Sequence, residues 1–381
     1  MQINRTRYLT LGLLCFCAFS SWGQTYEQFK TRRAFSAQDV GSLNLHLSGT
    51  QFFKNNEYFN DYTEGFTGIG FFIQPKLRYK YNAKTEFIAG LHIQKFAGQD
   101  KLSRTIPLFS IDHKINDEFR VIVGAIDGAM NHGLLEPFYR MDRYYLNHVE
   151  YGGQLLYNLE FLKGEVWVNW AQYFEKGGTD QELIYIGTNS NLVLGSTENL
   201  RFEMPIQIVG SHRGGQGGSF ILPMYSMFDM ALGFRGKMDL GLEKHLQVGV
   251  HGIYHLEKSN LVSGYVSGYK EGRGVLSQVQ YTTGKHNWEL GFWRGHRFAT
   301  PAGEYLFASD SDFRSYILQE NRQLITFKYG CDAQLGKGLS GNFRADIYAD
   351  PVVGDIAFGV GSFLFFDARF GLGKKEFRTV Q

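Results

Sequence analysis

The chain has 381 residues, of which 43% are hydrophobic and 16% aromatic, and its formal net charge is +2. A charge this small does not indicate a nucleic-acid partner, which would be met by a strongly basic surface. The sequence contains 46 glycines but only 7 prolines, and few prolines suit long β-sheets because proline interrupts the hydrogen-bond ladder. The length allows two soluble domains or one long barrel.

Residues 1–23 have the layout of a secretory signal. Arg5 and Arg7 give a positively charged start, and residues 8–19 form an apolar core that is too short to cross a bilayer as a helix. Small residues precede a plausible cleavage site after Gly23. The pattern therefore predicts a cleaved signal peptide, with a membrane anchor helix as the alternative.

Cysteine use argues against a disulfide-stapled domain. Cys15 and Cys17 lie within the predicted signal, so the mature chain keeps only Cys331 and forms no internal disulfide. No later segment approaches the 18 consecutive apolar residues of a transmembrane helix. The polar, unpatterned residues 24–40 are expected to form a short periplasmic lead-in.

From residue 41 to 373 apolar and polar residues alternate almost without a break. Residues 67–81 are the clearest case, where the apolar or aromatic set Ile69, Phe71, Ile73, Leu77, Tyr79 and Tyr81 alternates with the polar set Gln74, Lys76, Arg78 and Lys80. A period of two places successive side chains on opposite faces of a strand. We therefore expect one apolar and one polar face along each strand.

The last alternating segment, residues 355–372, is about 17 residues long, which exceeds a typical soluble strand but suits a tilted strand that crosses a bilayer. One of its faces is almost wholly apolar, with Phe358, Val360, Leu364 and Phe366 among its members. A sheet that faces lipid cannot leave an open edge. The last strand is therefore predicted to pair with the first one and close a barrel.

The connections between strands alternate in length. Long connections on one side and short turns on the other are typical of a transmembrane barrel. We predict an all-β, antiparallel up-and-down transmembrane barrel of about 16 strands, spanning 41–373, followed by a periplasmic tail at 374–381. A soluble β protein or solenoid is the alternative, but aromatic side chains along nearly every apolar face favour the membrane barrel. The connections on the long side, mostly long or glycine-rich, fall at 54–66, 97–103, 128–148, 176–180, 213–223, 258–271, 298–322 and 351–354.

In this pattern the chain resembles a Gram-negative outer-membrane β-barrel of the porin class. Gln24, directly after the predicted cleavage site, resembles the start of exported proteins from Bacteroidetes-type bacteria. The resemblance covers nearly the whole mature chain and rests on the pattern rather than on a motif. It implies an outer-membrane location and a role in transport. The tail 374–381 departs from the usual barrel, which ends near an aromatic residue.

The polar faces are then expected to line the lumen. A barrel of around sixteen strands is wide enough for an aqueous channel. The lining charges are mixed in sign, which predicts weak ion selectivity, although opposite charges that pair across strands would only stiffen the wall. The predicted pore-lining residues are Gln74, Lys76, Arg78, Lys80, Glu165, Arg201, Glu203, Asp229, Arg235, Arg344 and Asp346.

The segment 128–148 has no strand period and mixes apolar, aromatic and charged residues. We expect this loop to fold into the barrel and constrict it, with packing against the wall or stacking on sugar rings as alternatives. An acid–base pair of His132 and Glu136 is conceivable for a hydrolase, but no serine context supports it. The predicted constriction residues are His132, Glu136, Tyr139, Arg140, Asp142 and Arg143.

Other signals do not indicate a cofactor, metal or catalytic site. His251 and His255 share a face but lie about 13 Å apart along a strand, too far for one metal. The glycine-rich run 214–218 lacks the Lys-Ser/Thr ending of a phosphate loop, and no helix follows it.

The sequence as a whole predicts a non-enzymatic, porin-like channel for passive diffusion of small hydrophilic solutes, carbohydrates among them. The alternatives are a structural or assembly barrel that partners a surface lipoprotein or secretion complex, and an outer-membrane hydrolase. The expected partners are the lipid bilayer and small solutes, without nucleic acid. A homotrimer or a lipoprotein partner is compatible with the sequence.

Overall fold

The computed structural model describes residues 29–30, 40–175, 180–214, 223–261, 265–314 and 316–374. The predicted signal peptide, nearly all of the lead-in, the tail beyond 374 and most of the glycine-rich run lie outside the described residues.

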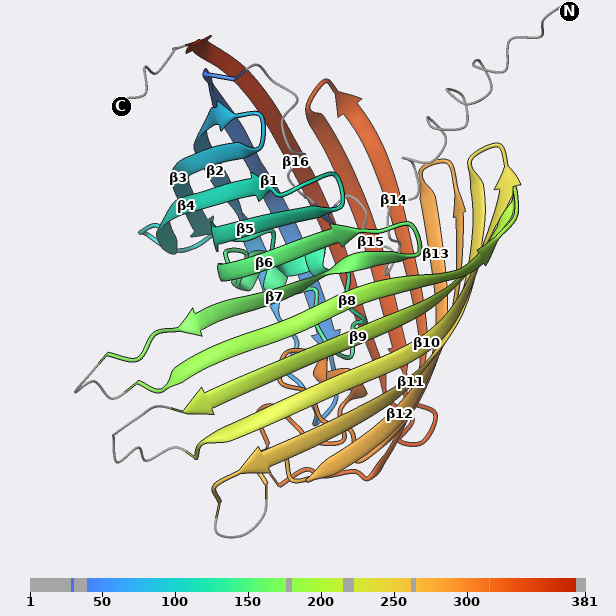
Figure 1. Ribbon diagram of the computed structural model, residues 1–381. Coiled ribbons are helices and arrows are strands. Elements are labelled where there is room, and N and C mark those ends of the chain that lie inside the picture. The colour runs from blue at the N-terminus through green and yellow to red at the C-terminus, as the bar shows by residue number, and fades with distance from the viewer. Residues whose placement is uncertain are drawn as a thin grey trace, which may run out of the picture.

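Sixteen antiparallel strands form one closed barrel (Figure 1), so the predicted fold class is confirmed. In chain order the strands are β1 (Ser42–Tyr58), β2 (Thr67–Asn82), β3 (Thr85–Phe96), β4 (Arg104–Lys114), β5 (Phe119–Ala125), β6 (Tyr151–Asn158), β7 (Leu162–Gln172), β8 (Glu182–Ser196), β9 (Leu200–Gly214), β10 (Tyr225–Gly241), β11 (Lys244–Ser259), β12 (Glu271–Thr283), β13 (His286–His296), β14 (Asn321–Gly336), β15 (Leu339–Ala349) and β16 (Ile356–Lys374).

Closure is made by the first and last strands. Phe52 of β1 stands opposite Phe363 of β16, and Tyr58 stands opposite Ala357. Each remaining strand pairs with its neighbours in sequence. The ring therefore leaves no open strand edge, as a sheet in a bilayer requires. Among the described residues, none of the helices is long and apolar enough to cross a membrane.

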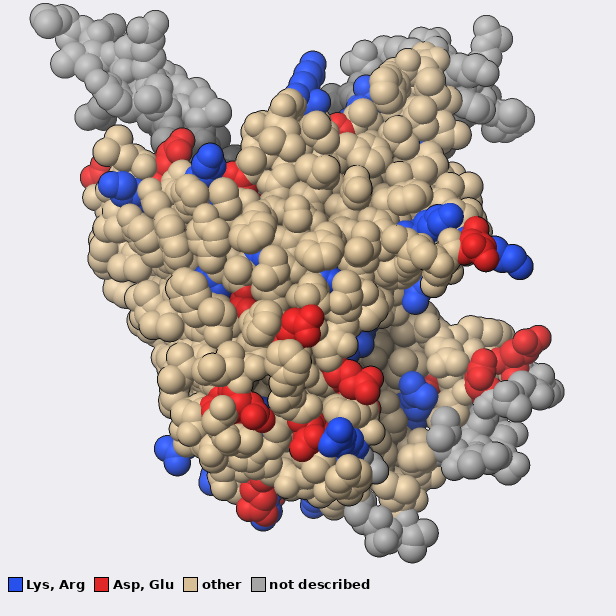
Figure 2. All heavy atoms as spheres, turned by 180° about the vertical axis from the view of Figure 1, so that it is seen from behind, with Lys and Arg blue, Asp and Glu red and all other residues tan. Residues whose placement is uncertain are grey.

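The two faces of the wall differ as the alternation predicts. On β2, Ile69, Phe71 and Leu77 are exposed on the outside, whereas Gln74 and Arg78 are buried on the inside. Large parts of the wall seen from behind carry no charged side chain (Figure 2). An apolar outer face is what a bilayer requires.

The connections alternate in length around the barrel. β2 and β3 are joined by two residues, and so are β10 and β11. By contrast, residues 126–150 join β5 to β6, and residues 297–320 join β13 to β14. The end with the longer connections is the extracellular end of a transmembrane barrel.

The two longest connections fold inward and fill much of the lumen. The first contains η2 (Ala129–His132) and α2 (Arg143–Leu146), and the second contains η3 (Tyr305–Phe307). Their side chains pack with wall residues in a buried apolar cluster, whose members include Leu134, Phe138, Trp167, Trp293, Leu306 and Phe307.

A second buried cluster lies beside β1 and β16. Phe29, from the predicted lead-in, packs edge-on against Tyr144 and Phe363, with ring centroids 5.1 Å and 4.8 Å away. A segment that precedes the first strand thus also contributes to the filling of the barrel.

Candidate functional site

A serine–histidine pair lies on the outer wall at the extracellular ends of β9 and β10. Ser226 Oγ is 2.9 Å from His212 Nδ1, and the two residues stand directly opposite each other in the antiparallel ladder. Their neighbours Ser211 and Met227 are buried on the inside, so His212 and Ser226 point outward. The pair arises because two adjacent strands place a hydroxyl and an imidazole at one register position.

The pair lies at the boundary between the apolar band and the polar rim. On β9 the outward residues from Phe202 to Ile208 are apolar, and His212 lies four residues beyond Ile208. On β10, Phe228 is the outward residue next to Ser226. In a transmembrane barrel, the end of the apolar band lies at the membrane–water interface.

Charged side chains flank the pair on both sides. Lys258 of β11 stands opposite Ser226. Glu182 of β8 stands opposite Gly214 and accepts a hydrogen bond of 2.9 Å from the indole of Trp170. His212 Nε2 lies 2.7 Å from the place where a Cβ on Gly214 would be, so this nitrogen is directed to the end of β9 where Glu182 stands.

The pair supplies two of the groups that a nucleophilic hydrolase uses, a hydroxyl and an imidazole. A serine hydroxyl is a weak nucleophile until an adjacent base accepts its proton, and a distance near 3 Å to an imidazole nitrogen is the geometry that this transfer needs. The outer wall carries a comparable pair at its periplasmic end, where Thr85 Oγ1 lies 3.0 Å from His113 Nδ1. That second pair provides a matched control.

The predicted pore-lining residues lie on the inner side of the wall, and most of their charges are paired there. Arg78 binds Glu86 at 2.7 Å, Arg235 binds Glu203 at 2.7 Å, and Arg344 binds Asp346 at 2.7 Å. The pairing across strands that the sequence analysis considered as an alternative is therefore present. The assignment of these residues to an open pore stays a prediction. Of the others, Lys76 donates to Gln74, Asp229 pairs with His255, Glu165 pairs with His132, Arg201 pairs with Glu203, and Lys80 is buried.

The predicted constriction loop lies inside the barrel, but its contacts differ from a His132–Glu136 pair. His132 contacts Glu150 and Glu165. Glu136 instead accepts hydrogen bonds from Lys328 and from Tyr348, the latter at 2.6 Å.

The remaining constriction residues also contact their neighbours. Tyr139 donates to Glu150, Asp142 accepts from Tyr145, and Arg143 lies over the ring of Tyr139. Their role as a pore constriction stays a prediction.

His251 and His255 both lie inside the barrel, as their place in the alternation predicts. His255 Nδ1 is 2.7 Å from Asp229 Oδ1, and both side chains are fully buried. Across the part of the chain that the structure describes, no group of three or more His, Cys, Asp or Glu side chains is arranged to hold a metal ion.

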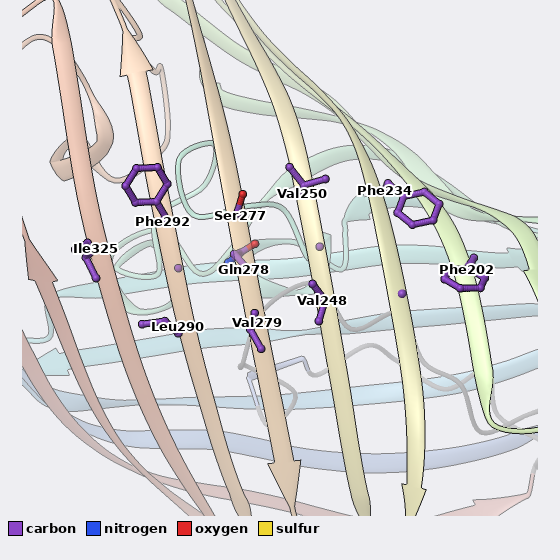
Figure 3. A pocket seen from close by; sticks show the side chains of 13 residues that line it. Phe202, Phe234, Val248, Val250, Ser277, Gln278, Val279, Leu290, Phe292 and Ile325 are labelled. Carbon is purple, nitrogen blue, oxygen red and sulfur yellow. The ribbon is translucent and has the colours of Figure 1, made fainter.

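A broad apolar hollow of about 620 Å³ lies on the outer wall across β9 to β14. Phe234, Val250 and Phe292 point outward around it (Figure 3). Ser277 is the one hydroxyl on this lining. Strand pairing places the hollow well away from the serine–histidine pair, because Phe234 is eight residues further along β10 than Ser226.

The closed ring, the apolar outer wall and the polar interior define a transmembrane β-barrel of the outer membrane, as predicted. The fold is similar to that of OprD from Pseudomonas aeruginosa, in two crystal structures. One has 9% identity, covers 91% of this chain and 98% of that chain, and gives a TM-score of 0.50. The other has 9% identity, covers 87% and 95%, and gives a TM-score of 0.51.

A BenF-like porin from Pseudomonas fluorescens Pf-5 is similar in the same way, with 8% identity, coverage of 87% and 100%, and a TM-score of 0.50. At such low identity these likenesses concern the fold alone. A model of the Lipid A 3'-O-deacylase-type family matches residues 35–375, and the chain belongs to this family. None of the proteins with curated descriptions matches the sequence.

Family membership corrects the expectation of a non-enzymatic barrel, because the family is described by a hydrolytic activity. The candidate pair could not be found within one stretch of sequence. His212 and Ser226 are separated by a loop and meet only through strand pairing. The sequence gives one indication of their place. Each residue lies an even number of positions from the apolar, outward-facing residues of its own strand, so each is expected to point outward.

Proposed function

We propose that this protein is an outer-membrane hydrolase that removes an acyl chain from an ester of an outer-leaflet lipid of the lipid A type. The observation that carries the proposal is the distance of 2.9 Å between Ser226 Oγ and His212 Nδ1 on the lipid-facing wall. The description of the family supports the same class of substrate and reaction.

The two residues divide the chemistry between them. Ser226 Oγ attacks the ester carbonyl carbon while its proton passes to His212 Nδ1. The ester C–O bond then breaks, and the imidazolium returns the proton to the departing sugar oxygen. Water attacks the acyl-serine and gives its proton to His212, and the serine leaves with that proton. The products are a fatty acid and a free hydroxyl on the lipid.

The flanking charges suit the same reaction. The Lys258 ammonium opposite Ser226 favours the negative charge of a phosphorylated head group and of the oxyanion that forms at the carbonyl. Glu182, at the end of β9 toward which His212 Nε2 is directed, favours the imidazolium that forms when His212 accepts the proton. We assign Lys258 to head-group and oxyanion stabilisation, and Glu182 to the positioning of His212.

The place of the pair explains how a membrane lipid reaches it. A lipid diffuses in the bilayer plane and meets the outer wall without entering the lumen. Ester groups lie just outside the hydrocarbon core, which is the height at which the apolar residues of β9 give way to His212. The substrate therefore needs neither a gate nor an open channel.

The test uses the full-length protein, refolded into vesicles that contain lipid A, with fatty-acid release measured by mass spectrometry. Ser226→Ala is expected to lower the rate at least about 1,000-fold, and His212→Gln at least about 100-fold. Thr85→Ala and His113→Gln, which alter the periplasmic pair, are expected to keep the wild-type rate. A fluorophosphonate probe is expected to label the wild type and not Ser226→Ala. Release that persists in Ser226→Ala would overturn the assignment.

A second candidate is the predicted porin-like passage of small hydrophilic solutes, sugars included. The observation that favours it is a polar cavity of about 430 Å³ at the extracellular mouth, lined by both inserted loops and by β7 and β8. The fold of the OprD and BenF-like porins supports it only at the level of architecture. The two inserted loops favour the hydrolase over a freely open pore, because their buried side chains occupy the lumen.

A further inference from the structure

The cavity at the extracellular mouth lies inside the barrel, on the opposite face of the wall that carries Ser226 and His212. Tyr185, which lines the cavity, stands opposite Ser211 in the β8–β9 ladder, one residue before His212. Its volume of about 430 Å³ falls within the range of small-molecule sites, about 300–1,000 Å³. The proposed hydrolase does not use this cavity.

Arg143 forms one side of the cavity. Its guanidinium lies between two aromatic rings, with its central carbon 4.5 Å from the centroid of Tyr139 and 4.9 Å from that of Tyr185. The side chain is only 7% exposed, and its Nε is buried with no hydrogen-bond partner among the described residues. Burying a hydrogen-bond donor without an acceptor costs free energy. An anion in the cavity would supply the acceptor for Arg143.

Arg140 provides a second cation on the same lining. It is half-buried, and within the described part of the chain its guanidinium forms no ion pair, although it acts electrostatically on Glu304 and Asp312. Asp312 is the one carboxylate that lines the cavity, and it accepts a hydrogen bond of 3.0 Å from Thr63. Two arginines against one carboxylate give the lining a formal charge of +1, and Arg143 also acts electrostatically on the buried Glu150 behind it.

The rest of the lining can recognise hydroxyl groups. The amide side chains of Asn147 and Gln172 line the cavity together with the tyrosines at 185 and 305. Amides both donate and accept hydrogen bonds, and a phenol does the same. Arginines bind carboxylate and phosphate oxygens, often in a bidentate manner.

We propose that this cavity is a binding site for a small sugar acid or sugar phosphate that enters from the extracellular side, with Arg140 and Arg143 as the residues that bind its anionic group. The site stands apart from the hydrolase proposal, because its residues lie inside the barrel and Ser226 lies outside. The Ser226→Ala variant is therefore expected to bind the ligand as the wild type does.

Isothermal titration calorimetry on the full-length protein in detergent tests the site with four probes: glucuronate, glucose 6-phosphate, glucose and inorganic phosphate. We expect at least one of the two charged sugars to bind at least ten times more tightly than glucose and than inorganic phosphate. Which of the two binds better identifies a carboxylate or a phosphate as the anionic group. Equal affinity for glucose, or for phosphate without the sugar, would overturn the assignment.

Two variants tie the binding to the cavity. Arg140→Gln is expected to weaken the charged sugar at least tenfold, and Ala171→Trp, which fills the cavity without changing its charge, is expected to abolish binding. Arg314→Gln is the control: Arg314 lies on the second inserted loop, two residues from Asp312, but pairs with Asp61, and neither residue lines the cavity. Unaltered affinity in both Arg140→Gln and Ala171→Trp would overturn the proposal even if a charged sugar binds.

Discussion

His132 Nδ1 lies 2.9 Å from Glu165 Oε1, which ties the inserted loop 126–150 to strand β7 of the wall. The other ring nitrogen is 3.0 Å from Glu150 Oε2, and all three side chains are buried. The ring also stacks on Trp167 at 4.1 Å. An imidazolium between two carboxylates therefore fixes the loop in the lumen.

His132→Gln is expected to loosen the loop and destabilise the barrel by about 3–5 kcal/mol, because it leaves two buried carboxylates without their cation. The measurement is the unfolding midpoint of the full-length protein in detergent. His113→Gln, at an exposed histidine of the outer wall, is expected to leave the midpoint almost unchanged. A wild-type midpoint in His132→Gln would show that the ring does not hold the loop.

The same contact predicts a loss of stability at alkaline pH. Burial alone would lower the pKa of His132, but the carboxylates of Glu150 and Glu165 raise it to about 9. A pKa raised by folding means that the stabilisation is complete below the unfolded value of about 6.5. It is then lost as the pH rises through about 9. Unfolding midpoints measured from pH 6 to pH 10 should fall in the wild type, and this part of the fall should be absent in His132→Gln.

Glu304, on the second inserted loop, gives a separate pH test. Burial, together with the nearby Asp142 and Glu136, raises the pKa of Glu304 to about 8. The neutral carboxyl is therefore favoured by the fold, and stability falls as the pH rises through about 8. Glu304→Gln keeps the neutral form, so it should match the wild type at pH 5 and exceed its unfolding midpoint at pH 9. The exposed Glu320, in an ion pair with Arg297, provides the control Glu320→Gln, which should show no such gain.

Gly303 allows the two inserted loops to meet. A Cβ at this position would lie 1.8 Å from the carbonyl oxygen of Pro137, beside the hydrogen bonds from Arg140 N to Ala302 O and from Glu304 N to Glu136 O, each 3.0 Å. Gly303→Ala is expected to cost about 1–3 kcal/mol and to speed tryptic cleavage of the loop 297–320.

Gly252→Ala is the matched control for Gly303→Ala. This glycine lies on β11, and its nearest neighbour to a new Cβ is 3.9 Å away. Equal cleavage rates in the two variants would show that the two loops do not depend on this close contact.

The sequence predicts the architecture well because a period of two needs no tertiary information. The alternation on β2 already indicates which face meets lipid: Ile69 and Phe71 lie on the outer face, and Gln74 and Arg78 lie on the inner face. The first strand is longer than expected, since β1 continues to Tyr58. The last residues of β1 are polar, and those that point inward bind other wall residues, as Lys54 binds Asp346 at 3.0 Å. The alternation of apolar and polar residues therefore stops before the strand itself ends.

The candidate site was out of reach of the sequence for a different reason. Ser226 and His212 are brought together by the register of two strands, and register across a long loop is not encoded in either segment alone. Likewise, His132 meets Glu165 through a loop that enters the barrel. Alternation predicted the face on which each of these wall residues lies, but not the neighbour that it meets.

The inserted loops predict how the barrel conducts ions. Wild-type protein in a planar bilayer should show few or no channel openings, because the buried residues of 126–150 and 297–320 occupy the lumen. Replacement of residues 130–146 and 300–316 by short Gly-Ser linkers should produce stable openings on the order of a nanosiemens, since a barrel of this strand number is wide enough for an aqueous channel once both loops are removed.

In that shortened variant Lys76→Glu should shift the reversal potential toward cation selectivity, because Lys76 is only partly buried on the inner wall. Arg78→Glu is expected to unfold or destabilise the barrel instead, since Arg78 is held by Glu86 at 2.7 Å and its reversal places two buried carboxylates together. Large openings in the unmodified protein would mean that the loops leave the lumen in a bilayer, and would favour the channel over the hydrolase as its main activity.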